Sequence, residues 1–488
     1  MKTISRRRFI KASAAGITAV LPWQRVLGAN EDIRVAIVGI RGKGSHHISM
    51  FRDIPGVRVT ALCDADTEIL DREQKKFDER SEKVRSIVDV RKILDDKNID
   101  AIVTATPNHW HALLTIWACQ AGKDVYVEKP ASHSIWEGRK MVEAVEKYNR
   151  IAQVGMHSRS GEAIRQALEY IRQGNLGAIK VVRGFCTKPR RSIGKVCGPQ
   201  PIPGTVDYDL WSGPAALKPL MRKRLHYDWH WVWDTGNGDI ANQGVHEMDL
   251  CRWALGQNQL PPRVMSIGGR FGYDDDGETA NTQMAVFDYK PAPLIFEVRG
   301  LPTARRHRDD PKAWGSNMSH YKGIRIGIAI ECENGYYAGG GGGGWVYDND
   351  GKKIRQFTGE GCDRHQANFI AAVRSRKTTD LNAPVIDGHL SAALCHMANI
   401  SHRLGTSSVP KQIRGAIKDI CGAADSYERF QDHIFANEIN LEKTPVIAGP
   451  WLDFDASSER FTGESFAKWA NAMIKDPYRE PFVVPEKV

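Results

Sequence analysis

The sequence predicts an α/β protein with an N-terminal domain on a parallel sheet and a C-terminal α+β domain with a large open, mainly antiparallel sheet. Between residues 30 and 155, short apolar runs alternate with single helical segments, which is the pattern of βαβ units. After Gly155 the apolar runs lengthen and follow one another, as antiparallel strands do. The length of 488 residues also exceeds what one hydrophobic core usually holds.

The first domain is expected over residues 30–155. Its strands are predicted from apolar runs at Ile33–Val38, Val57–Cys63, Ala101–Thr104, 124–127 and Ile151–Val154. Its helices are predicted up to Met50, over 66–80, up to Gln120 and over Ile135–Tyr148. Single helices between successive strands imply parallel pairing with right-handed crossovers.

The second domain is expected over residues 156–440, with residues 441–488 as a tail that packs on the body or on a neighbouring subunit. Its strands are predicted at Ile179–Cys186, Arg263–Phe271, Gln283–Tyr289, Leu294–Arg299 and Gly323–Cys332. Helices are predicted at 161–173, Gln366–Arg374 and Gly388–Leu404. The six glycines Gly339–Gly344 predict a mobile loop. A large open sheet commonly needs a partner face, so a homodimer or homotetramer is expected.

Composition argues against several classes of protein. The net charge of +10 comes from scattered basic residues without aromatic interleaving, which disfavours nucleic-acid binding. No segment is long and apolar enough to predict a stable membrane span. The nine cysteines include no C-x-x-C pair, so neither a disulfide framework nor a zinc site is supported.

The N-terminus predicts export. Ser5–Lys11 carries the twin-arginine pattern, Ala12–Leu21 is weakly apolar, and Gly28-Ala29 is a plausible cleavage point. We therefore expect residues 1–29 to be a signal peptide, the Tat export machinery to be a partner, and the folded protein to be periplasmic. The alternative is a basic amphipathic start without a role in export.

A glycine turn after the first strand predicts a dinucleotide site. Gly39 and Gly44 occupy the first and third glycine places of the G-x-G-x-x-G pattern, whereas Arg41 stands in the middle place and Gly42 follows it. Asp64 ends the next strand, where an acid holds the adenosine ribose hydroxyls, so NAD is favoured over NADP. Alternatively, Asp64 merely caps the following helix.

The segment Asp124–Pro130 predicts a buried strand that ends at a charged pair. Pro130 cannot continue the strand ladder, so Glu128 and Lys129 lie at the carboxyl edge of the sheet, where ligands bind. A lysine there can shift its pKa and accept a proton. The alternative is a surface Glu-Lys pair that caps the strand.

These elements, together with residues 106–111 and 236–249, resemble the Gfo/Idh/MocA oxidoreductases, the glucose–fructose oxidoreductase and inositol dehydrogenase family. The resemblance implies that Lys129 and His246 are catalytic, Lys129 at the reacting hydroxyl and His246 facing the substrate. It also implies a cofactor-binding set comprising Gly39, Arg41, Gly42, Gly44, Asp64, Pro107, Asn108, His111, Glu128 and Lys129. Many relatives carry an aspartate where this chain has Asn242, so its role is missing here or has moved to Asp239 or Asp249.

The aromatic run Tyr227–Trp233 predicts a carbohydrate pocket, because aromatic rings pack on the apolar faces of sugars. Candidate substrate-binding residues are Arg159, Lys188, Trp231, Asn242 and His246. The alternation of His226, Asp228 and His230 would suit metal ligands, but no further ligand is implied and no metal is expected.

The expected function is therefore an NAD(P)-dependent oxidoreductase acting on a ring hydroxyl of a sugar, glycoside or polyol, with tightly bound NAD. A redox-neutral glycosidase or lyase that uses NAD transiently is an alternative, as is a sugar-binding protein on a retired Rossmann scaffold.

Overall fold

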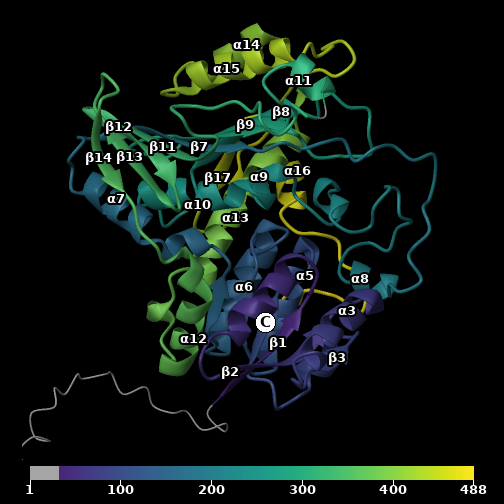
Figure 1. The fold of residues 1–488 in the computed structure, drawn as a ribbon. Helices are drawn as coiled ribbons and strands as arrows, with labels where there is room; N and C mark the ends of the chain where they lie inside the picture. Colours follow the sequence, from purple (N-terminus) through teal and green to yellow (C-terminus); the bar gives the residue numbers. More distant parts are fainter. Residues whose placement is uncertain (1–31, 311) are drawn as a thin grey trace, which may run out of the picture. The chain divides into compact units, whose positions relative to one another are not determined.

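A computed structural model describes residues 32–310 and 312–488 (Figure 1). The predicted signal peptide, residues 1–29, lies outside the described residues. Within the described part of the chain, no helix is long and apolar enough to cross a membrane.

The N-terminal sheet has six parallel strands in the order β3-β2-β1-β4-β5-β6. The strands are β1 Ile33–Val38, β2 Val57–Cys63, β3 Arg85–Ile87, β4 Ala101–Thr104, β5 Asp124–Val127 and β6 Ala152–Val154. The short β3 was not among the expected strands. The direction of winding reverses between β1 and β4, and the carboxyl ends on either side of that point form the ligand crevice of such sheets.

Helices flank this sheet, as the βαβ pattern predicts (Figure 1). They are α2 Lys43–Arg52, α3 Thr67–Asp78, α4 Arg91–Leu94, α5 Asn108–Gln120 and α6 Ile135–Lys147. Asp66 caps α3 by accepting a hydrogen bond from the Glu68 N–H at 3.1 Å, and Ser134 caps α6. A helix from late in the sequence, α12 His365–Ser375, also packs here, with Phe369 against Phe51 and Tyr126.

The second sheet has twelve strands and is mostly antiparallel, with β7 and β10 paired in parallel. The predicted fold class is therefore confirmed. Its long strands are β7 Ile179–Thr187, β8 Arg263–Gly269, β9 Thr282–Phe287, β10 Leu294–Arg299, β11 Ile326–Cys332, β12 Gly335–Gly340, β13 Gly343–Tyr347 and β14 Lys353–Phe357. Short strands β15 Thr406–Ser407, β16 Ile447–Ala448, β17 Leu452–Asp455 and β18 Arg460–Thr462 extend it beyond β8.

The prediction of a mobile loop at Gly339–Gly344 is wrong, because these glycines belong to the hairpin of β12 and β13. Gly339 pairs with Gly344, and Gly340 pairs with Gly343. A Cβ atom on Gly339 would lie 2.4 Å from the Gly343 carbonyl oxygen and 2.4 Å from the Tyr337 hydroxyl. The glycines therefore allow close packing between strands.

Helices cover both faces of the large sheet. On one face lie α7 Glu162–Arg172, α10 Gly244–Ala254 and α13 Val385–Arg403. On the other face, α14 Pro410–Ile417 and α15 Ala423–Ala436 pack apolar side chains on β8, β9 and β10. Figure 1 shows these two helices at its top, above the sheet. Part of the sheet face on which a second subunit was expected is thus covered by the chain's own helices α14 and α15. The homodimer or homotetramer stays a prediction.

Residues from 441 onward pack on the body of the protein. Strands β16 and β17 pair with β8, and α16 Ala467–Ala472 follows. The last residues return to the N-terminal domain, where the ring of Phe482 lies 5.4 Å from Trp110 and 6.3 Å from Trp117 on α5.

Candidate active site

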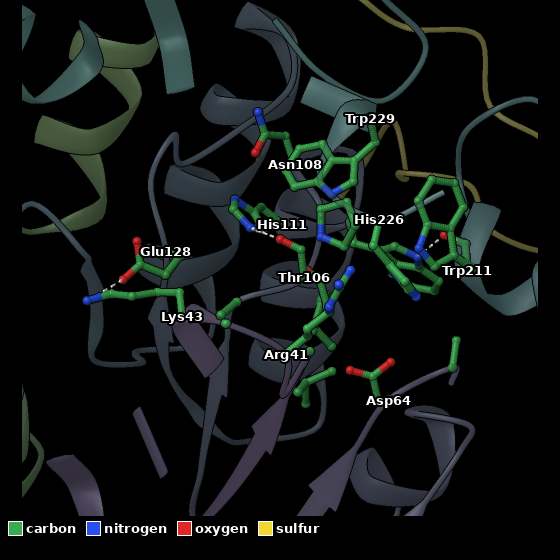
Figure 2. A pocket seen from close by; sticks show the side chains of 18 of the residues that line it. Arg41, Lys43, Asp64, Thr106, Asn108, His111, Glu128, Trp211, His226 and Trp229 are labelled. Carbon is green, nitrogen blue, oxygen red and sulfur yellow. Dashed lines mark hydrogen bonds and ion pairs between the residues drawn. The ribbon is translucent and has the colours of Figure 1, made fainter. Parts of the chain in front are cut away.

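A cavity of about 870 Å³ lies at the carboxyl ends of β1, β2, β4 and β5 (Figure 2). Its walls come from the loops that follow these strands and from parts of the chain beyond residue 155. Among the predicted residues, the following line it: Gly39, Arg41, Gly42, Asp64, Pro107, Asn108, His111, Glu128, Lys129, Asn242 and His246. The cavity therefore brings together, at the carboxyl edge of the sheet, residues that are more than 200 positions apart.

The glycine turn between β1 and α2 has the geometry of a phosphate cradle. Gly39 has φ +74° and a Cβ there would lie 2.6 Å from the Thr106 backbone nitrogen, whereas at Gly42, with φ +50°, a Cβ would meet nothing within 4 Å. The predicted Gly44 does not line the cavity; a Cβ there would be 1.9 Å from the Gly39 oxygen. No side chain caps the N-terminus of α2, so its N–H groups can receive an anion.

Asp64 ends β2 and its carboxylate is held in place by backbone donors. The Ile40 N–H donates to Oδ2 at 2.9 Å, and the Asp66 N–H donates to Oδ1 at 3.1 Å. Burial raises the pKa of Asp64, and the two backbone hydrogen bonds oppose this shift. Since Asp66 caps α3, Asp64 is not merely a helix cap.

The loops after β4 and β5 are tied together by His111. Its ring nitrogens lie 2.7 Å from the Pro130 carbonyl oxygen and 2.9 Å from the Thr106 carbonyl oxygen. Beside it, the buried amide nitrogen of Asn108 has no hydrogen-bond partner among the described residues. An unpaired buried donor on a cavity wall indicates a place for an external acceptor.

Glu128 is a buried anion, only 5% exposed, so the alternative of a surface ion pair is wrong. His47 contacts its Oε1 at 2.8 Å and Lys43 lies 3.8 Å from the same oxygen, as Figure 2 shows for Lys43. Burial would raise the pKa of Glu128, but the hydrogen bond from His47 and the nearby cations lower it on balance. A Cβ on Gly155 would lie 2.8 Å from Glu128 Oε1, so a glycine is needed there.

Lys129 follows directly and is half-buried on the cavity wall. Its Nζ donates to the Asn242 carbonyl oxygen at 2.6 Å. Burial lowers the pKa of Lys129, while the negative charge of Glu128 partly opposes this shift. The ammonium therefore releases its proton more readily than a lysine in water, which suits a proton acceptor.

Two imidazoles, those of His246 and His157, line the same cavity and lie close enough to Lys129 for its charge to act on them. His246, on α10, is 9% exposed, and its Nδ1 has no hydrogen-bond partner in the described part of the chain. Its ring lies edge-on to His157 at 4.9 Å. Burial and then the charge of Lys129 hold the pKa of His246 well below its ordinary value, and burial also lowers the pKa of His157. Both rings are therefore neutral near pH 7.

Three proposed substrate residues do not line the cavity. Arg159 is buried in a bidentate pair with Asp249 at 2.8 and 2.9 Å and also donates to Asp387 at 2.6 Å. Lys188 donates to Gln243 Oε1 at 3.0 Å. Trp231 is 5% exposed, with the Arg190 guanidinium over its ring. These predictions are corrected because each side chain is occupied by a partner distant in the sequence.

The two suggested replacements for the missing aspartate are each held by an arginine and do not line the cavity. Asp239 is paired with Arg190 at 2.6 and 2.9 Å, and Asp249 is held by Arg159. Besides Glu128, the buried carboxyl group of Glu247 acts electrostatically on Lys129. Burial raises the pKa of Glu247 to about 8, against the opposing effects of hydrogen bonds and of Lys129 and Lys188.

Several cavity residues were missed by the sequence analysis. His157 follows the end of β6, so the carboxyl-edge rule that located Glu128 could have found it. No local signal marks Leu210 and Trp211, which also line the cavity. The aromatic run Tyr227–Trp233, by contrast, was predicted as a pocket wall, and its residues Tyr227, Trp229 and His230 line the cavity beside His226.

The metal alternative at residues 226–230 gains no support from the geometry. His226 Nε2 lies 3.0 Å from Asp66 Oδ2, and Asp228 is paired with Arg224 at 2.7 Å. Across the described residues, no group of three His, Cys, Asp or Glu side chains is arranged to hold a metal ion.

Two models of one protein family match the chain. Residues 33–156 match the family described as "Oxidoreductase family, NAD-binding Rossmann fold" (GFO_IDH_MocA), and residues 174–289 match its "C-terminal alpha/beta domain". These two stretches therefore match the NAD-binding and the C-terminal domain of the Gfo/Idh/MocA oxidoreductase family. The first domain is an NAD-binding Rossmann domain.

Curated relatives are distant. "Glycosyl hydrolase family 109 protein 1" of Shewanella sp. (strain ANA-3) is 24% identical over 206 residues, which cover 37% of this chain and 45% of that protein. The "Alpha-N-acetylgalactosaminidase" of Shewanella oneidensis is 23% identical over 206 residues, with the same coverage. The chain thus spans less than half the length of these relatives.

Solved structures share the fold. The WlbA dehydrogenase from Bordetella pertussis, solved with NADH and UDP-GlcNAcA, has a TM-score of 0.56 at 20% identity and covers 76% of this chain and 97% of that one. Levoglucosan dehydrogenase, solved with NADH, has a TM-score of 0.56 at 18% identity and covers 75% and 96%.

Proposed function

We propose that this protein is an NAD-dependent oxidoreductase that acts on a ring hydroxyl of a sugar, glycoside or polyol. The observation that carries the proposal is Lys129, half-buried on the wall of a cavity that also contains the glycine turn and Asp64. A proton acceptor with a lowered pKa beside a dinucleotide cradle is what oxidation of a carbinol requires.

The chain's residues fit NAD. The turn at Gly42 and the N-terminus of α2 suit the pyrophosphate, and the fixed carboxylate of Asp64 suits the ribose hydroxyls. Arg72, which also lines the cavity, is paired with Glu73 at 3.1 Å, and a carboxylate at position 64 repels a 2′-phosphate. NAD is therefore favoured over NADP.

When bound, NAD supplies the hydride acceptor, and the chain supplies the rest. Lys129, in its neutral form, takes the hydroxyl proton, and the backbone carbonyl of Asn242 orients its Nζ. His246 is a neutral imidazole with an unpaired nitrogen that can bind the same hydroxyl. Glu128 stays ionised beside Lys43 and His47 and favours the protonated form of Lys129 after transfer.

A redox-neutral glycosidase or lyase reaction is a second candidate. Elimination next to a transient ketone needs a second proton-transfer group, and His157 provides one 4.9 Å from His246. The curated relatives named as family 109 glycosyl hydrolases favour this candidate as well.

The predicted signal peptide supports a periplasmic enzyme exported after it has folded. Because the periplasm offers no obvious supply of free NAD, the proposal includes a cofactor that stays on the protein through successive turnovers. The homodimer or homotetramer is proposed on the open sheet, of which the β11–β14 part is not packed by α14 and α15.

The test combines native mass spectrometry with product analysis. The purified protein is expected to carry NAD and to give nicotinamide absorbance changes with members of a glycoside panel. A keto sugar without bond cleavage supports the oxidoreductase, whereas a released aglycone without net redox change supports the second candidate. A protein that neither binds NAD nor transforms any glycoside would refute both and favour a sugar-binding protein.

A further inference from the structure

One wall of the cavity comes from a long excursion of the chain between β7 and α9 Asp239–Asn242. We call residues 203–230 the strap. They leave the second domain and dock on the Rossmann domain before they return. Figure 2 shows three of their side chains: Trp229 and His226 are drawn beside Asn108 and His111, and Trp211 farther to the right.

The strap's first docking point is the loop after β2, which carries Asp64. Val206 and Asp66 form an antiparallel bridge, in which the Asp207 N–H donates to the Ala65 oxygen at 2.8 Å and the Thr67 N–H donates to the Thr205 oxygen at 2.9 Å. The strap is therefore joined by backbone hydrogen bonds directly beside the acid of the adenosine half.

A side-chain contact reinforces this junction. His226 Nε2 lies 3.0 Å from the Asp66 carboxylate. A small separate apolar cluster surrounds it, comprising Val206, Trp211, Leu220, Leu225, Ala65, Ile202, Tyr208 and Trp229. The strap thus has a core of its own with the loop after β2.

The second docking point is the start of α5, on the opposite side of the crevice. The Trp110 indole N–H donates to the Leu210 and Trp211 oxygens at 3.1 and 3.2 Å, and His109 Nε2 lies 3.1 Å from the Trp211 oxygen. Gly213 lies against the Trp110 ring, where a Cβ would be 2.2 Å from a ring atom. The strap therefore spans the crevice from the β2 loop to the β4 loop.

The C-terminal tail holds the strap from outside. Arg479 donates to the Asp209 carboxylate at 2.8 Å, to the Asp209 backbone oxygen at 2.6 Å and to the Ala215 oxygen at 3.3 Å. The neighbouring Phe482 packs on Trp110, to which the strap is anchored. Release of the strap therefore requires these contacts to open as well.

We propose that the strap forms the outer wall of the adenosine half of the dinucleotide site and keeps the nucleotide on the protein. Its cavity-lining residues are Leu210, Trp211, His226, Tyr227, Trp229 and His230. The cofactor exchanges when the Asp66–Val206 bridge opens. The inference rests on the proposed function, and it identifies the residues that produce retention. Asp66 and Arg479 are positioning residues in it, since they act through the strap.

A reversible cross-link tests this inference. Asp66 and Val206 form a pair flanked by backbone hydrogen bonds, and the Cα atoms of such pairs lie about 4.5 Å apart, within disulfide range. The Asp66→Cys/Val206→Cys protein is loaded with NADH and chased with excess NAD, and loss of nicotinamide fluorescence gives the release rate. The oxidised form, verified by mass spectrometry of the linked peptides, is expected to release NADH at least roughly tenfold more slowly than the reduced form of the same protein. The single Val206→Cys variant controls for the oxidant.

A second variant weakens the strap from the tail side. Arg479→Ala is expected to speed NADH release by about threefold or more, because it removes charge-assisted hydrogen bonds to the strap. Lys475→Ala is the matched control, because Lys475 pairs with Glu486 within the tail. This variant should release NADH at the wild-type rate.

The outcomes separate this inference from the proposed function. Equal release rates for the oxidised and reduced forms of the double-cysteine protein, or for Arg479→Ala and wild type, would overturn the proposed role of the strap. The proposal that the protein binds NAD would be unaffected. A protein that binds no NADH in any form would overturn the proposed function and this inference together.

Discussion

Arg159→Met should destabilise the protein by about 3 kcal/mol while leaving substrate affinity unchanged. Arg159 is 8% exposed and makes three hydrogen bonds of 2.6 to 2.9 Å to the carboxylates of Asp249 and Asp387. Removing one partner of a buried ion pair costs roughly 3–5 kcal/mol, because the remaining charge is left uncompensated. We expect a loss of about 3 kcal/mol, at the lower end of this range, because Arg252 still pairs with Asp387 at 2.6 Å after Arg159 is removed.

Urea unfolding followed by tryptophan fluorescence measures the loss of stability, and a glycoside titration measures KM. Arg165→Met, at an exposed position on the neighbouring helix α7, is the matched control and should change the free energy of unfolding by less than about 0.5 kcal/mol. Adding Asp249→Asn to Arg159→Met should recover part of the loss, because it removes the unpaired charge. Unchanged stability together with a raised KM would show that Arg159 binds substrate and would refute this reasoning.

Gly39→Ala should abolish NADH binding measured by fluorescence titration, because a Cβ would lie 2.6 Å from a backbone nitrogen in a residue with φ +74°. Asn242→Asp should shift the pH profile of kcat/KM to higher pH, because a carboxylate on the cavity wall raises the pKa of Lys129. An unchanged profile would show that the side chain at position 242 lies too far from Lys129 to affect its pKa. Attachment of the C-terminal tail should weaken in alkali. Burial alone would lower the pKa of His133, but Asp476 on the tail raises it to about 9. The stability that the His133–Asp476 pair contributes is therefore complete below pH 6.5, the pKa of histidine in the unfolded chain, and is lost as pH rises through about 9. Between pH 6 and pH 10 the thermal unfolding temperature of the wild type should fall by more than that of His133→Phe.

Most of the fold could be predicted because its signals are local. Each parallel strand is an apolar run of a few residues followed by a turn, and proline ends β5 where Glu128 and Lys129 emerge. The same logic located the cavity, since every carboxyl end of a parallel sheet points to one edge. It would also have located His157, had the end of β6 been treated in the same way.

What the sequence could not predict depends on contacts between distant segments. Arg159 carries no local mark that distinguishes a surface cation from one paired with Asp249, 90 positions away. The six-glycine run is flexible in isolation, and its strand conformation comes from pairing across the hairpin. The strap and the C-terminal tail likewise gain their places from partners on the Rossmann domain.

Lys129→Met tests the central claim most directly, in a protein already shown to bind NADH and to oxidise a glycoside. The variant should bind NADH within about threefold of wild type, while the single-turnover rate of hydride transfer falls by a factor of roughly 10³, because a positioned proton acceptor is lost. Lys188→Met is the control, because Lys188 Nζ donates to Gln243 and does not line the cavity. Its rate of hydride transfer should fall by less than tenfold. A Lys129→Met protein that transfers hydride at the wild-type rate would contradict the account.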